Sequence, residues 1–128
     1  MNRGRAMHGI VRYVSAVYVF GGSKNPVLNP EDSKSAEIYD IVEDIWKETT
    51  PMPVGADEAS CVRVHDKIFV TSSNFALISF TPWNEQYTTI INDFSVHEYS
   101  RALWRINEKT YLCNKDSGLE LDNEGQVL

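Results

Sequence analysis

The chain has 128 residues, of which 42% are hydrophobic and 11% aromatic, so it has enough apolar material for a packed core. Its many Trp, Tyr and Phe residues, with abundant Val, Ile and Thr, favour strands over helices. Twelve basic and eighteen acidic residues give a net charge of −6, which excludes the positive field that attracts nucleic acid.

The sequence also lacks the segments that direct a protein to or across a membrane. No apolar run approaches the roughly 18 residues of a membrane span, and no hydrophobic stretch follows the first residues as in a signal peptide. Cys61 and Cys113 are far apart and have neither disulfide nor metal spacing, so we expect two buried free thiols. These features predict a cytoplasmic protein.

Along the chain, turn-forming residues separate twelve short apolar segments that are typical of strands. The predicted strands are 8–13, 17–20, 36–39 and 45–49, then 60–64, 68–71, 76–80 and 86–90, and finally 102–106, 110–113, 119–121 and 126–128. No window keeps the spacing of an amphipathic helix. The fold class is therefore predicted to be all-β.

Large apolar side chains recur every 41 residues at two positions of a repeating unit. They are Tyr39, Phe80 and Leu121 at the first position, and Trp46, Tyr87 and Leu128 at the second. A period of this length is typical of propeller blades. We therefore expect a β-propeller fragment of three four-stranded antiparallel blades, over about residues 6–50, 57–91 and 99–128.

The first unit has an apolar strand that ends in Gly21 and Gly22, then Tyr39-Asp40, then Trp46, and then Pro-Met-Pro at 51–53. In this order these residues resemble the kelch repeat. The glycines permit a tight turn and close packing, and the two aromatic residues are expected to fill the space between blades. The later units diverge, with Ser-Ser at 72–73 and Asn-Lys at 114–115 in place of the glycine pair.

This resemblance to the kelch domain of BTB-kelch (kelch-like) adaptors implies protein recognition. The first hypothesis is substrate recognition for a cullin-type ubiquitin ligase, and the alternative is an actin-binding or other structural scaffold. A kelch-fold oxidase or epimerase is less favoured, because the sequence has no nucleophile, phosphate-loop or metalloprotease motif. The three histidines lie one in each unit. We therefore expect no catalysis, no metal and no cofactor.

Loops at the mouth of the channel are the expected contact region for a protein or peptide partner, over residues 23–35, 51–58 and 91–100. The candidate contact residues are Lys24, Asn25, Asp57, Glu58, Asn74, His97, Tyr99 and Arg101. Three blades would also leave two blade faces uncovered. The remaining blades of a parent chain, or a second copy of this chain, are expected to cover them.

Overall fold

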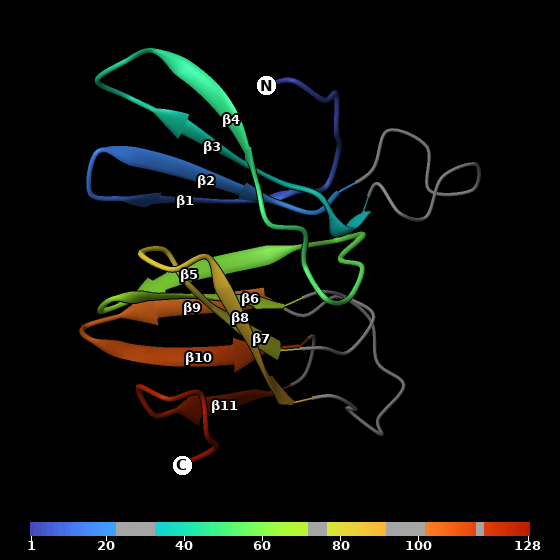
Figure 1. The fold of residues 1–128 in the computed structure, drawn as a ribbon. Helices are drawn as coiled ribbons and strands as arrows, with labels where there is room; N and C mark the ends of the chain where they lie inside the picture. Colours follow the sequence, from blue (N-terminus) through green and yellow to red (C-terminus); the bar gives the residue numbers. More distant parts are fainter. Residues whose placement is uncertain (23–32, 72–76, 92–101, 115–116) are drawn as a thin grey trace.

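A computed structural model gives the fold of residues 1–22, 33–71, 77–91, 102–114 and 117–128. These residues form three antiparallel sheets that follow one another along the chain (Figure 1). None of the described residues belongs to a helix of the length and apolarity that a membrane crossing requires.

Each sheet is built from strands that are consecutive in sequence and paired in order. The first blade contains β1 (Gly9–Tyr13), β2 (Ala16–Phe20), β3 (Ala36–Asp40) and β4 (Ile45–Thr49). The second contains β5 (Ser60–Val64), β6 (Lys67–Thr71), β7 (Leu77–Thr81) and β8 (Gln86–Ile91), and the third contains β9 (Ala102–Ile106), β10 (Lys109–Cys113) and β11 (Gly118–Leu121). The all-β class and the blade order agree with the sequence prediction.

The last predicted strand, over 126–128, is reduced to a single antiparallel bridge between Val127 and Leu121. The carboxylate of Asp122 accepts hydrogen bonds from the backbone N–H groups of Glu124 (2.9 Å) and Gln126 (2.8 Å). The turn therefore extends as far as Gln126, and the bridge begins directly after it at Val127. The third blade keeps the fourth-strand position, but only as this bridge.

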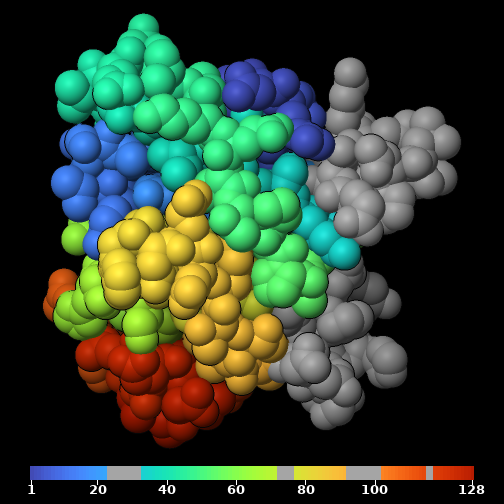
Figure 2. Space-filling view, in the orientation of Figure 1, coloured from blue at the N-terminus to red at the C-terminus, as the bar shows by residue number. Residues whose placement is uncertain are grey.

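The three blades pack face to face, with the first strand of each blade beside that of the next. Strand β1 contacts β5, and β5 contacts β9. In the space-filling view the blades form successive layers, and the green segment between β4 and β5 crosses the junction of the first two (Figure 2). The two hydrophobic cores lie at these junctions, one between each pair of neighbouring blades.

The aromatic residues of the 41-residue repeat show which way each blade packs. Phe80 is fully buried, its ring centroid lies 4.8 Å from that of Tyr87, and it also contacts Tyr18 and Phe20 of the preceding blade. The hydroxyl of Tyr87 donates to the carbonyl of Thr50 (2.6 Å) in the link that leaves the first blade. The repeated pair of the second blade therefore packs against the blade before it, whereas in the third blade Leu121 is buried and Leu128 is 75% exposed.

The same pair in the first blade faces outward. Tyr39 and Trp46 pack together with ring centroids 5.2 Å apart, and both side chains are half-buried. Tyr39 is paired with Val17, so it lies on the opposite side of the sheet from Tyr18, which contacts the second blade. Within this chain the two residues lie on an open blade face and do not fill a junction between blades.

Candidate recognition surface

The longer connections all leave the blades at one end. The strands that precede these connections, β2, β4 and β8, end at Phe20, Thr49 and Ile91, all towards the right-hand side of Figure 1. The opposite end carries short hairpins, such as the two-residue turn between Tyr13 and Ala16. We call these the loop end and the hairpin end of the molecule.

Gly21 and Gly22 hold the base of the loop end together. Both have left-handed backbones, with φ of 66° and 70°. A Cβ on Gly21 would lie 2.4 Å from the carbonyl oxygen of Ala56, and a Cβ on Gly22 would lie 2.4 Å from that of Ala6. The backbone N–H of Gly22 donates to the Ala56 carbonyl at 2.8 Å. Only glycine permits this approach of three chain segments.

A buried ion pair, which the sequence analysis missed, reinforces the same region. The guanidinium of Arg5 lies 2.7 Å from the carboxylate of Glu37, and their side chains are 2% and 0% exposed. Arg5 also donates to the carbonyls of Gly21 (2.8 Å) and Ser35 (3.1 Å), and the backbone N–H of Asn2 donates to Glu37 (2.6 Å). The pair thus fastens the N-terminal segment to the loop bases.

A sequence signal for this pair exists. Glu37 stands in a strand at the position that Ile78 occupies 41 residues later. A charged residue at an apolar position of a repeat needs a partner when it is buried. Arg5 lies outside the strands, so the repeat alone does not identify it as that partner.

Two of the predicted contact residues lie on described parts of the loop end. Asp57 is half-buried and Glu58 is exposed, both in the link between β4 and β5. The other six, Lys24, Asn25, Asn74, His97, Tyr99 and Arg101, lie outside the described residues. Asp57 and Glu58 are neighbours in the link, and their contact with a partner stays a prediction.

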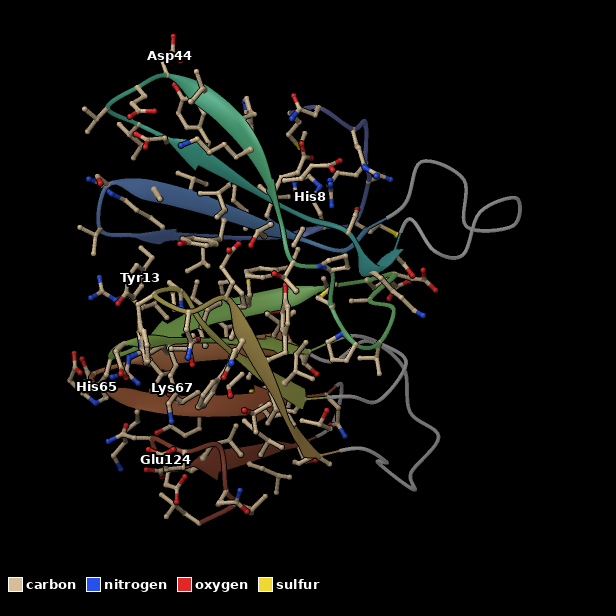
Figure 3. All side chains as sticks on the ribbon, in the orientation of Figure 1. His8, Tyr13, Asp44, His65, Lys67 and Glu124 are labelled. Carbon is tan, nitrogen blue, oxygen red and sulfur yellow. The ribbon has the colours of Figure 1, made fainter. Side chains whose placement is uncertain are left out.

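The described histidines lie at different ends of the molecule. Figure 3 shows His8 near the loop end and His65 at the hairpin end. The Nδ1 atom of His8 is buried, with no hydrogen-bond partner among the described residues. His97 lies outside the described residues. Over the described part of the chain, no three His, Cys, Asp or Glu side chains gather as a metal site would require.

The two cysteines are free thiols, as predicted, but both residues are half-buried and not fully enclosed. Desolvation nonetheless raises the pKa of the Cys61 thiol from 9.0 to about 12. Cys61 is therefore a neutral thiol near pH 7, and it lacks the thiolate character of a catalytic nucleophile.

A polar cavity of about 360 Å³ lies between the outer parts of the second and third blades. Hydroxyl groups dominate its wall, and an ion pair between Lys67 and Glu124 closes one side at 2.5 Å. The lining residues are Lys67, Ser79, Thr81, Thr88, Thr89, Ile90, Glu124 and Gln126. These groups can form hydrogen bonds, but they include no activated nucleophile.

Comparisons with known proteins agree with this architecture. Residues 4–53 match the family model of the kelch motif. The chain is 29% identical over 90 residues to Kelch-like protein 26 of Danio rerio, a match that covers 70% of this chain and 15% of that protein. The chain therefore spans only a small part of this relative.

The fold is also similar to that of a solved protein, described as the structure of YjhT. The TM-score is 0.65 at 13% identity, over 84% of this chain and 33% of the YjhT chain. This likeness shows the fold alone. With the blade stacking, it identifies the chain as a run of three β-propeller blades, of which the first matches the kelch motif.

Proposed function

We propose that this chain is a protein-interaction module that recognises substrates for an adaptor of a cullin-type ubiquitin ligase. The observation that carries the proposal is the kelch motif at residues 4–53, on a blade whose longest connections leave at one end of the molecule. A rigid scaffold with a cluster of loops at one end is the usual architecture of a recognition surface. The similarity to Kelch-like protein 26 supports the adaptor part of the proposal.

The described polar groups favour binding over catalysis. Arg5 and Glu37 are almost fully buried charged residues of the loop end. They form an ion pair with each other, and Arg5 also donates hydrogen bonds to backbone carbonyls. Burial keeps the Cys61 thiol neutral. The proposed role therefore involves no catalysis and no cofactor, and contacts are made through exposed loop residues such as Glu58.

We further propose that the protein works in the cytoplasm. Both cysteines are unpaired, and a reducing compartment keeps thiols in that state. Fluorescence microscopy of the tagged protein tests this location. Exclusion of the tagged protein from the cytoplasm would contradict it.

Affinity purification from cells tests the recognition surface. The full chain is compared with a variant in which Asp57, Glu58, Tyr99 and Arg101 are all changed to alanine. The control variant carries Glu43→Ala and Asp66→Ala, two exposed acidic residues of the hairpin end. We expect partners to be lost only in the loop-end variant, with its thermal unfolding unchanged.

The outcomes separate the parts of the proposal. Equal recovery of partners by all three proteins would overturn the loop-end assignment. Recovery of partners without a cullin, from cells that express the whole gene product, would overturn the adaptor assignment. Co-sedimentation with actin filaments would favour the cytoskeletal alternative instead.

A further inference from the structure

Arginine occupies the same position in the first strand of every blade. Strands β1, β5 and β9 each have five residues, and Arg12, Arg63 and Arg105 are the fourth residue of each. Because β1 lies beside β5, and β5 beside β9, the three arginines form a row at the hairpin end. This end lies opposite the proposed loop surface, so the row needs an explanation of its own.

Two arginines of the row form no ion pair with any described carboxylate. Five other cations, Arg3, Arg5, Lys47, Lys67 and Lys109, each pair with a glutamate. Arg105 also pairs with Glu108 at 2.8 Å, and its side chain is mostly buried. In a chain with a net charge of −6, Arg12 and Arg63 are exceptions, because both are exposed and neither has a carboxylate partner in the described part of the chain.

The backbone orients both of these guanidinium groups. The Nε of Arg12 donates to the carbonyl of Val14 at 3.0 Å, and the Nε of Arg63 donates to the carbonyl of His65 at 2.9 Å. In each case the acceptor belongs to the turn that follows the strand. One edge of the guanidinium is thereby fixed, and the terminal Nη groups form no hydrogen bond with any residue that the structure describes. A planar guanidinium that is held in place is well suited to bidentate binding of a carboxylate.

An aromatic side chain lies against Arg63, on the opposite side of β1 from Arg12. The guanidinium carbon of Arg63 is 4.5 Å from the ring centroid of Tyr13, the residue after Arg12. Edge-to-face contact with Tyr18 fixes the Tyr13 ring, at a centroid distance of 6.3 Å. Figure 3 shows Tyr13 and His65 at the same end of the blades. Arginine and tyrosine are the side chains that dominate binding energy at protein interfaces.

We propose that Arg12 and Arg63, the latter packed on Tyr13, bind the carboxylates of an acidic segment in a partner protein. The two arginines lie on adjacent blades, so they select acidic residues that are spaced along an extended peptide. Two cations on an acidic protein do not neutralise a phosphate backbone, so a peptide is favoured over a nucleic acid. The surface is independent of the loop end.

Fluorescence anisotropy at low salt tests the proposal on the full chain. The probe is a fluorescein-labelled peptide of about twelve residues that alternates Glu with Ser, and the control peptide has Gln in place of Glu. We expect only the Glu peptide to bind, and added salt to weaken its binding. Arg12→Gln with Arg63→Gln should reduce the affinity about tenfold or more, which corresponds to about 1.4 kcal/mol.

Two further variants separate charge from folding. Arg12→Lys with Arg63→Lys loses the same Nε hydrogen bonds but keeps the charge, so it should bind better than the glutamine variant. Arg3→Gln removes an exposed, ion-paired arginine elsewhere in the first blade and should leave the affinity unchanged. Equal binding by the lysine and glutamine variants would overturn the proposal. Equally tight binding of a single-stranded oligonucleotide that is lost in the same variants would overturn the choice of an acidic protein.

Discussion

Single side chains in this chain differ widely in their contribution to stability. Two ion pairs of the N-terminal segment illustrate the range. Arg5 and Glu37 are 2% and 0% exposed, whereas Arg3 and Glu48 are 48% and 56% exposed. Both pairs connect the N-terminal segment to the first blade. A buried charge that loses its partner stays in a medium that solvates it poorly, while an exposed charge returns to water.

Replacing Arg5 by alanine should therefore lower the free energy of unfolding by about 3–5 kcal/mol, because Glu37 is left buried without its partner. The matched change Arg3→Ala should cost less than about 1 kcal/mol. Urea unfolding followed by tryptophan fluorescence measures both values. Similar losses in the two variants would show that Glu37 is more solvated than its position indicates.

Val14 is the second residue where a single side chain has a clear cost. It is β-branched, yet it lies in a hairpin turn with φ of 55°, a conformation that such residues rarely adopt. The side chain is exposed, so packing offers little compensation. Val14→Asn should stabilise the chain by about 1 kcal/mol, because asparagine tolerates this region of backbone space. The matched change Val42→Asn, in a turn residue with no positive φ, should give no gain in melting temperature. Equal gains would mean that solubility, and not strain, is responsible.

At the scale of strands, the repeat allows a blade face that is covered by a neighbouring blade to be compared with one that is not. Phe80 and Tyr39 occupy the same repeat position, as do Tyr87 and Trp46. Of these two blades, the second has a neighbouring blade on that side and the first has none within the described residues. Phe80→Ala should cost about 3–5 kcal/mol, because a fully buried ring is lost from the junction. Trp46→Ala should cost only about 1–2 kcal/mol, because its ring is half-buried. Denaturant unfolding of the two variants measures both losses of unfolding free energy. A loss for Trp46→Ala that is larger than about 1–2 kcal/mol would mean that another surface covers Trp46.

The strands are also where sequence reasoning succeeded most clearly. The sequence pattern predicted both ends of eleven strands to within one residue, because apolar alternation and turn residues act locally. The twelfth strand was predicted over 126–128 but is a single bridge, because the turn at Asp122 extends to Gln126, the first residue of the predicted strand. Local pattern does not reveal how far a side-chain-stabilised turn extends.

The parts of the site that could not be predicted depend on contacts between distant residues. Arg5 and Glu37 are 32 residues apart, and no spacing rule connects them. Arg12 and Arg63 do stand at equivalent positions, so the repeat contains that signal. That no described carboxylate pairs with them appears only when the folded neighbours are known.

At the scale of the whole molecule, the stacking of three blades leaves one apolar face open at each end. The first blade presents Ile10, Tyr39 and Trp46, and the third presents Trp104, Ile106 and Tyr111. In the two junctions within the chain, the equivalent faces are covered by the next blade. An apolar face of this kind is normally covered in a soluble protein, and we propose that further blades of a parent chain or a second copy cover these two.

This arrangement predicts that the isolated chain associates with itself as its concentration rises. The open face of the third blade of one copy can pack against that of the first blade of another, since the chain itself joins blades in this way twice. Multi-angle light scattering should therefore show a mass that increases with concentration. Trp104→Glu, which places a charge on the open face at a side chain that is 57% exposed, should shift the mass towards that of a single chain. Trp83→Glu changes a tryptophan that is 77% exposed in the turn between β7 and β8, away from both open faces, and should have no such effect. A wild-type chain that stays monomeric at all concentrations would contradict the prediction and would show that the open faces tolerate water.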